Sequence, residues 1–317
     1  MKTTSTSRRW RAFSLLAVVG VLALASCSDN KSDSGSDGST KTTSASSDGG
    51  SGDAIRITSA DFSEQKVLAQ VYGQYLQDQG IDVEIQDPIG TREQIFKALE
   101  DGKVDLQLDY SGPAVTFLGG TPSADPQETY DALVPLLEEK DLAASEQSEA
   151  ADSDALVALS SWAEDNGVTT ISDLADVDGT LTLGGAAECS ERPQCLPGYK
   201  DTYGLDLQFK AVDYGPPLVA ALKADEIQVA QYQSTAPEIS TGEIVQLEDD
   251  KGLHPAANVV PVFRSDVSSD ELLKALNTLS AAITTEDLAA WNQSTDVEKE
   301  DPTDVATAWL EDNDLLK

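Results

Sequence analysis

Two aromatic residues, Phe62 and Tyr110, stand where a ring could contact a ligand. Each follows a short apolar run that is typical of a β-strand, and open α/β sheets bind ligands beyond the C-terminal ends of their strands. The face of an aromatic ring attracts a cation by about 0.5–2 kcal/mol, and by more where water is excluded. Tyr214 and Tyr232 offer further rings later in the chain. Each of the four could instead be a core or surface residue, so they are candidates for a cation site.

The segment Gly90-Thr91-Arg92 offers the opposite chemistry. It lies at a predicted helix start, where backbone N–H groups and the helix dipole favour an anion, with the Thr91 hydroxyl and the Arg92 guanidinium nearby. Arg92 could equally form a salt bridge at the surface or between domains. Four further residues could supply supplementary hydrogen bonds from hydroxyl or amide groups: Ser63, Ser111, Gln233 and Thr235.

Residues suited to catalysis are sparse. The only histidine is His254, in Leu253-His254-Pro255, and no Ser or Cys nucleophile motif accompanies it. The sequence has no Gly-rich phosphate loop of the Walker type and no cluster of metal ligands. We therefore predict that the chain is not an enzyme and that it carries neither a metal nor a cofactor.

Short strands and amphipathic helices alternate along the body of the chain, which predicts an α/β fold. The first strand, 55–59, precedes a helix at 64–79 whose apolar residues share one face. A strand at 81–85 leads to a helix that Thr91 should cap, with Gln94 three residues on. In the next strand, apolar residues at 104, 106 and 108 alternate with polar ones. This strand should bury one face and place Tyr110 at its end.

The pattern restarts after Asp152 and changes again near Glu248. The middle stretch predicts strands and helices in alternation, at 155–159, around Trp162, at 180–183, after Pro216 and at 227–230. The last stretch predicts one apolar strand at 259–263 and three capped helices that begin near Ser268, Thr284 and Asp301.

Three short motifs recur in this order and near this spacing in one protein family: Phe62-Ser63-Glu64-Gln65, Gly90-Thr91-Arg92-Glu93 and Asp109-Tyr110-Ser111-Gly112. Weaker likeness continues downstream, for example at Leu196-Pro197-Gly198-Tyr199 and Pro261-Val262-Phe263-Arg264. Over roughly 55–310 the chain resembles the osmoprotectant-binding lipoproteins of ABC importers. Members of that family capture glycine betaine, choline and related quaternary amines outside the cell.

The resemblance implies a two-lobed fold of the periplasmic-binding-protein type II class, with a hinge and a ligand cleft between the lobes. Residues 54–151 and 249–317 should form lobe one, and residues 152–248 lobe two. It also implies a membrane permease as partner and, through it, an ATPase subunit. A quaternary ammonium group has no N–H donor, so aromatic faces and carboxylate or carbonyl oxygens must hold it, which suits the four ring candidates.

The chain departs from the family around the expected cage of rings. Ala257 and Asn258 stand where members often have a Tyr pair, Pro113 replaces a frequent Thr, and Gln231-Tyr232 replaces a usual Asp-Gly pair. The same receptor fold could therefore serve a different zwitterion or amine, such as an amino acid. A structural or adhesive surface lipoprotein is the alternative from another class.

Residues 1–26 are predicted to be a lipoprotein signal peptide. Cationic residues precede an apolar run, 13–25, that is too short to span a membrane. The sequence Leu24-Ala25-Ser26-Cys27 is a pattern at which lipoprotein signal peptidases cleave, so Cys27 should carry lipid; an ordinary secretory signal is the alternative. Residues 27–53, rich in Ser, Gly and Asp, should be a flexible tether. These features predict an extracytoplasmic protein that is lipid-anchored to the cell membrane.

Cysteine content and charge fit export. Only Cys189 and Cys195 remain besides Cys27, and outside the cytoplasm a disulfide between them is the default, worth about 2 kcal/mol. Without the four cationic residues of the signal, 17 Lys and Arg face 56 Asp and Glu, a formal net charge of −39. This charge excludes nucleic acid and disfavours contact with anionic lipid except through the anchor. It attracts cations only weakly at physiological salt, and the alternative is an acidic surface that only keeps the protein hydrated and soluble.

Overall fold

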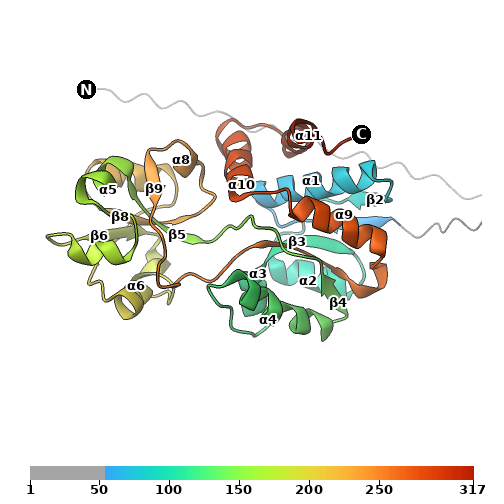
Figure 1. The fold of residues 1–317 in the computed structure, drawn as a ribbon, viewed down its shortest axis with the longest axis horizontal. Coiled ribbons are helices and arrows are strands. Elements are labelled where there is room, and N and C mark those ends of the chain that lie inside the picture. The colour runs from blue at the N-terminus through green and yellow to red at the C-terminus, as the bar shows by residue number, and fades with distance from the viewer. Residues whose placement is uncertain (1–53) are drawn as a thin grey trace, which may run out of the picture. The chain divides into compact units, whose positions relative to one another are not determined.

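The computed structural model describes residues 54–317, which contain two five-stranded sheets with helices packed on them (Figure 1). The first sheet has the strand order β2-β1-β3-β10-β4 and the second β7-β6-β8-β5-β9. The predicted α/β class with two lobes is confirmed. We call the part of the chain around the first sheet the first lobe and the part around the second sheet the second lobe. The predicted signal peptide, Cys27 and the tether lie outside the described residues.

The first sheet combines an early parallel part with one late strand. β1 (Ile55–Thr58) lies between β2 (Val83–Ile85) and β3 (Leu106–Tyr110) and is parallel to both. β10 (Val259–Arg264) runs antiparallel to β3 and to β4 (Leu142–Ala144). Alternate residues of β10 enter opposite faces: Val259 and Phe263 pack with α1, whereas Val260 and Val262 pack with α2 to α4.

The second sheet repeats this plan. β6 (Thr182–Gly185) lies between β7 (Gln208–Ala211) and β8 (Val229–Gln233) and is parallel to both. β5 (Asp154–Leu159) runs antiparallel to β8 and to β9 (Ile244–Gln246). In each sheet, therefore, an antiparallel strand pairs with a set of three parallel strands. The chain forms that antiparallel strand directly after it crosses from the other lobe.

The two connecting segments between the lobes lie side by side. The segment 145–153 leads from β4 to β5, and the segment 247–258 leads from β9 to β10. A hydrogen bond of 3.1 Å joins the Asp152 amide to the Ala257 carbonyl, and one of 2.9 Å joins the Val259 amide to the Ala150 carbonyl. This antiparallel pairing holds the end of one segment against the end of the other, beside the cavities described below.

Helices of the first lobe cover both faces of its sheet (Figure 1). The apolar stripe predicted for α1 is buried, and its Tyr72 hydroxyl lies 2.9 Å from the Ser280 hydroxyl of α9. The short helix α3, which the sequence did not predict, begins directly after β3 with Tyr110 as its N-cap. The helices are α1 (Ser63–Asp78), α2 (Arg92–Glu100), α3 (Ser111–Phe117), α4 (Pro126–Glu138), α9 (Asp270–Ser280), α10 (Thr285–Asn292) and α11 (Pro302–Asp312).

The second lobe has shorter helices: α5 (Ser160–Asn166), α6 (Leu196–Tyr203), α7 (Pro216–Lys223) and α8 (Pro237–Ser240), with 3-10 turns η1 (Ser172–Asp176) and η2 (Ala187–Ser190). The sequence placed one strand of this lobe at 227–230, but β8 extends to Gln233. Tyr232 therefore lies within the strand rather than beyond its end. Among residues 54–317, no helix combines the length and apolar character needed to cross a membrane.

Candidate functional site

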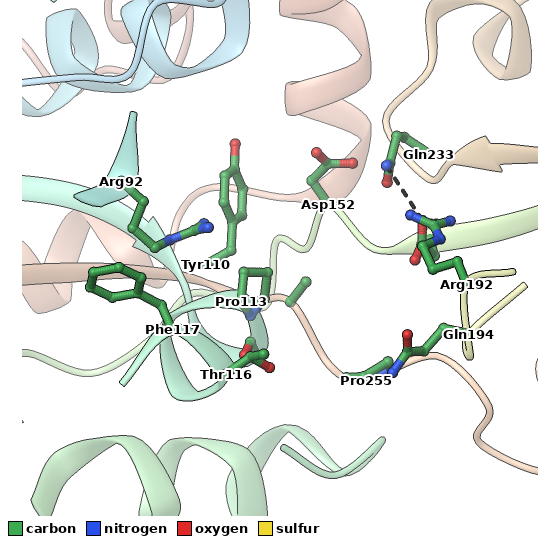
Figure 2. A pocket seen from close by; sticks show the side chains of 13 residues that line it. Arg92, Tyr110, Pro113, Thr116, Phe117, Asp152, Arg192, Gln194, Gln233 and Pro255 are labelled. Carbon is green, nitrogen blue, oxygen red and sulfur yellow. Dashed lines mark hydrogen bonds and ion pairs between the residues drawn. The ribbon is translucent and has the colours of Figure 1, made fainter. Parts of the chain in front are cut away.

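Two cavities of about 540 Å³ and 410 Å³ adjoin each other where the two lobes and the connecting segments meet. They share Asp152 of the first connecting segment and Gln233 at the end of β8, so we treat them together as the cleft. Figure 2 shows the larger cavity, with Arg92 and Tyr110 of the first lobe on one side and Arg192 and Gln194 of the second lobe on the other.

The smaller cavity combines aromatic rings with carboxylates. Phe62 and Glu64 reach it from the start of α1, Tyr214 from the loop before α7, and Asn292 from the end of α10. The rings of Phe62 and Tyr214 are 45% and 52% exposed, which leaves aromatic surface available to a ligand from each lobe. The remaining lining residues are Asp61, Ser63, Lys66, Asp152, Gln233, Thr235, Ala236, Pro237 and Asp296.

Tyr110 lines the larger cavity at the end of β3, the strand end at which the sequence placed it; the strand itself is buried on both faces, not on one face as its alternation predicted, because Gln107 and Asp109 are covered as well. The pairing of Tyr110 with Val259 of β10 fixes the position of its backbone. The side chain is buried, and its hydroxyl donates a hydrogen bond to Oε1 of Glu64. Burial and the nearby Glu64 carboxylate raise the pKa of Tyr110 well above its ordinary value. The phenol therefore stays neutral and acts as a donor.

Glu64 and Asp152 place two carboxylates deep in the smaller cavity. Glu64 is only 2% exposed, and its Oε2 accepts a hydrogen bond of 2.7 Å from Nδ2 of Asn292. Asp152 accepts a hydrogen bond of 2.9 Å at Oδ1 from the Thr235 hydroxyl. Burial and then the Glu64 charge raise the pKa of Asp152 to about 8, and burial also raises the pKa of Glu64. A positive group in this cavity would relieve that penalty.

Arg92 lines the larger cavity, but its main contact is within the first lobe. Thr91 caps α2 through a reciprocal capping box with Gln94, as predicted, and does not line either cavity. The Arg92 guanidinium binds Asp109 through Nε and Nη2, both at 2.8–2.9 Å from Oδ1. Arg92 therefore forms a salt bridge, but with the buried Asp109 of its own lobe rather than at the surface or between domains, and the guanidinium still faces the cavity.

A second guanidinium, that of Arg192, faces the larger cavity from the second lobe. Arg192 and Gln194 lie in the loop between Cys189 and Cys195, which are joined by a disulfide. Nη2 of Arg192 donates to Oδ1 of Asp154 at 3.0 Å, while its Nε is buried without a hydrogen-bond partner among the described residues. No sequence motif predicted a role for Arg192. The flanking cysteines were the signal that its loop is held in place.

The remaining candidates divide between the cleft and its support. Tyr232 is 1% exposed, and its hydroxyl donates to the Gly215 carbonyl at 2.7 Å. Its ring centroid lies 5.0 Å from that of Tyr214, so it supports Tyr214 rather than lining either cavity. Ser111 is also buried, and its hydroxyl accepts a hydrogen bond of 3.2 Å from the Asn258 amide. The candidates that the structure brings to the cleft are Phe62, Ser63, Arg92, Tyr110, Tyr214, Gln233 and Thr235.

Sequence reasoning missed Glu64 and Asp152 as residues of the cleft. Glu64 stands inside the first of the three motifs, yet in a chain with 56 acidic residues no local pattern marks which carboxylates are buried. The described residues contain no group of His, Cys, Asp or Glu side chains arranged to hold a metal ion. The smaller cavity thus offers aromatic surface and carboxylates, and the larger cavity adds two guanidinium groups beside the ring of Tyr110.

Two known binding proteins are similar to this chain over most of its length. The chain is 25% identical over 279 residues to the glycine-betaine-binding protein of Pseudomonas aeruginosa, covering 83% of this chain and 89% of that one. It is 28% identical over 284 residues to the carnitine transport binding protein OpuCC of Listeria monocytogenes, covering 85% and 90%.

Solved structures show the same fold. A glycine betaine/carnitine/choline ABC transporter protein superposes with a TM-score of 0.77 at 23% identity, over 83% of this chain and all of that one. Apo YehZ from Escherichia coli gives 0.74 at 22% identity, with the same coverage. Residues 53–312 match the model of the substrate-binding domain of ABC-type glycine betaine transport systems, and the chain belongs to that family.

Proposed function

We propose that the chain is the extracytoplasmic solute-binding component of an ABC importer, and that it captures a quaternary amine such as glycine betaine or choline. The observation that carries the proposal is the smaller cavity, in which rings from both lobes stand beside the buried carboxylate of Glu64 and the half-buried carboxylate of Asp152. In this proposal the protein delivers the solute to a membrane permease that works with an ATPase subunit; membership of a family of ABC-type transport components supports this role.

The smaller cavity suits the cationic end of such a solute. Phe62 and Tyr214 offer exposed ring surface, and each ring that contacts a cation contributes about 0.5–2 kcal/mol. Glu64 and Asp152 add negative charge in a region of low dielectric, where it acts strongly. Both carboxylates already accept hydrogen bonds from the protein, so they do not require a ligand with N–H donors.

The larger cavity suits a carboxylate at the other end of the solute. Arg92 and Arg192 face it from different lobes, and Arg192 keeps its Nε free of a protein partner among the described residues. A guanidinium offers donors in a fork that matches a carboxylate. Because the positive and negative parts of the cleft meet at Asp152 and Gln233, a zwitterion of the betaine kind satisfies both parts and choline only one.

Calorimetric titration with glycine betaine, choline, carnitine and a panel of amino acids tests the proposal directly. We expect saturable binding of at least one quaternary amine, with betaines bound more tightly than choline. Exclusive binding of amino acids would favour the alternative receptor for another zwitterion. If no small solute raises the melting temperature in a thermal-shift screen, the alternative of a structural or adhesive lipoprotein would replace the proposal.

Capture is proposed to involve closure of two lobes, 54–151 with 249–317 and 152–248, about the paired connecting segments. The proposal is supported by the cleft, which draws residues from both lobes. Small-angle scattering should give a smaller radius of gyration with saturating ligand than without it. An unchanged scattering profile under conditions where calorimetry shows full occupancy would argue against closure.

Anchoring is proposed to follow cleavage before Cys27 and its acylation, with residues 1–26 removed and 27–53 serving as the tether. Replacing Cys27 with Ala should release the protein or leave an unprocessed precursor in the membrane, because an acyl chain can no longer be attached. Mass spectrometry of the mature N-terminus checks the result. A Cys27→Ala protein that is processed and still anchored would contradict lipidation.

A further inference from the structure

Glu64 and Asp152 are linked across the lobes by a chain of hydrogen bonds. Thr235, which follows β8 of the second lobe, donates from its hydroxyl to Asp152. Its backbone carbonyl accepts a hydrogen bond of 3.1 Å from Nδ2 of Asn292, which also donates to Glu64. On its other side Glu64 accepts from Tyr110. A group bound between Glu64 and Asp152 therefore contacts both lobes and the connecting segment at once.

Neither carboxylate has a cationic partner among the described residues. Glu64 and Asp152 form no ion pair there, while the three cationic side chains of the two cavity linings, Lys66, Arg92 and Arg192, are each paired with another carboxylate. Nζ of Lys66 lies 2.7 Å from Oδ1 of Asp61, and Nη2 of Arg192 lies 3.0 Å from Oδ1 of Asp154. Two carboxylates in one cavity without a counter-charge, Glu64 buried and Asp152 half-buried, cannot both ionise without a large electrostatic cost.

The other titratable groups that face the pair increase this cost. Asp296 of the turn after α10 acts on Glu64, and Asp154 at the start of β5 acts on Asp152. The hydroxyl groups of Tyr110 and Tyr214 stay neutral, because burial and nearby carboxylates, Glu64 for Tyr110 and Asp152 for Tyr214, raise the pKa of each. The surroundings thus supply negative charge and neutral donors.

We propose that Glu64 and Asp152 share one proton in the empty cleft and release it when the positive group of the ligand binds. The pair thereby selects ligands that carry a positive charge. On binding, the O–H bond of the protonated carboxyl breaks, the proton passes to the buffer, and the ligand cation takes its place as counter-charge. The inference rests on the proposed function and adds to it a reason why a positive ligand is preferred over a neutral one of the same shape.

The pKa directions give the sign of the resulting pH dependence. With the pKa of Asp152 raised to about 8, the empty cleft holds the proton at about pH 7. A bound cation lowers that pKa, so binding releases up to one proton. The dissociation constant should therefore rise as the pH falls below about 8, by up to about tenfold per pH unit, and level off above it.

Calorimetry in two buffers with different ionisation enthalpies, phosphate and Tris, measures the proton directly. At about pH 7 we expect wild type to release close to one proton per choline bound. The uncharged isostere of choline, in which a tert-butyl group replaces the trimethylammonium group, should bind at least about tenfold more weakly and release none. Choline binding without proton release, or equal affinity for the isostere, would overturn the inference and leave the proposed function intact.

Matched variants distinguish the effect of Glu64 and Asp152 from that of the many other acidic residues of the chain. Asp152→Asn and Glu64→Gln keep the side-chain shape and should each abolish proton release and flatten the pH dependence. Glu139→Gln removes an exposed carboxylate at the end of α4 and should behave as wild type. Circular dichroism checks folding, and either variant of the pair suffices if the other does not fold. Unchanged proton release in the folded variants would place the titrating group elsewhere and contradict the inference.

If wild type binds no quaternary amine, the proposed function fails, but the shared proton can still be tested by a measurement without ligand. Potentiometric titration of empty wild type should show about one more group titrating between about pH 6 and 9 than Asp152→Asn does. Glu139→Gln, which removes an exposed carboxylate far from the pair in sequence, should not differ from wild type in this range. Superimposable titrations of wild type and Asp152→Asn would overturn the shared proton.

Discussion

The two lobes are built on the same sheet plan but supply their ligand-facing residues in different ways. In the first lobe these residues stand on regular elements: Tyr110 ends β3, Arg92 begins α2, and Glu64 lies in the first turn of α1. In the second lobe, Arg192 lies in a disulfide-closed loop and Tyr214 in the loop before α7. The first lobe positions its side of the cleft through the core, whereas the second uses local supports.

This difference predicts that substitutions in the two lobes separate stability from binding. A residue whose side chain is part of the core cannot be truncated without a loss of folding free energy. A residue on a supported loop can be truncated at little cost to folding, although the ligand loses the same kind of contact. The predictions below test this contrast, beginning with the largest expected effect.

Truncation of the Tyr110 ring should have the largest effect. Tyr110 is buried in the main core of the first lobe, so Tyr110→Ala should lower the free energy of unfolding by about 3–5 kcal/mol. It should also weaken binding of a quaternary amine about five- to thirtyfold, equivalent to about 1–2 kcal/mol. Urea denaturation and calorimetric titration measure the two effects. Tyr110→Phe should retain most of the affinity, because the ring face remains.

Tyr214→Ala is the counterpart in the second lobe. Its ring is half exposed, so its loss should change the free energy of unfolding by less than about 1 kcal/mol while weakening binding to a similar extent as Tyr110→Ala. If Tyr214→Ala destabilised the protein as much as Tyr110→Ala, the contrast between core and loop supports would be wrong. Unchanged affinity would instead remove Tyr214 from the site.

Removal of the disulfide should have the next largest effect. Replacing Cys189 and Cys195 with Ser frees the loop that carries Arg192 and Gln194, and the loop-entropy estimate gives a loss of about 2 kcal/mol in the free energy of unfolding. Glycine betaine should lose more affinity than choline, because only the betaine has a carboxylate for Arg192. Denaturation and titration of the double variant check this. Equal loss for both ligands would assign the disulfide to global stability.

The two arginines should differ in a related way. Arg192→Ala should weaken the binding of glycine betaine by about tenfold and the binding of choline little. The free energy of unfolding should change little, because Arg192 is partly exposed. Arg92→Ala should also weaken the betaine, but it leaves the buried Asp109 without its partner and should lower the midpoint in urea as well. Titration and denaturation of both variants test the distinction. Equal weakening of choline and betaine by Arg192→Ala would exclude carboxylate recognition by that side chain.

The same contrast explains how much the sequence could predict. Periodicity and capping residues predicted the strands and helices that carry Tyr110 and Arg92, because those signals are local. The position of Tyr232 depended on where β8 ends, and strand ends are set by pairing with β5 rather than by local composition. Glu64 and Asp152 are held in the cleft by hydrogen bonds from residues distant in sequence, Tyr110, Asn292 and Thr235, and no local pattern encodes those contacts.

The smallest expected effect concerns Asp249, which holds the second connecting segment against α6. Its Oδ1 accepts hydrogen bonds from the Tyr203 hydroxyl and the Leu253 amide, and its Oδ2 accepts one of 2.7 Å from the His254 amide. Burial alone would raise the pKa of Asp249, but the hydrogen bonds from His254, from Tyr203 and from the backbone outweigh it and lower that pKa below its ordinary value.

The lowered pKa fixes the direction of the pH effect. The stabilisation by Asp249 is fully present above the pKa of an unfolded aspartate, about 4, and is lost as the pH falls below that value. Asp249→Asn should therefore lower the free energy of unfolding by about 1 kcal/mol at pH 7 and by clearly less near pH 3. Urea denaturation of wild type and variant at both pH values measures this, with Asp201→Asn of the α6 surface as the control. A deficit that is the same at both values would show that the network of Asp249 acts through packing, and the second lobe would then resemble the first in how it supports the cleft.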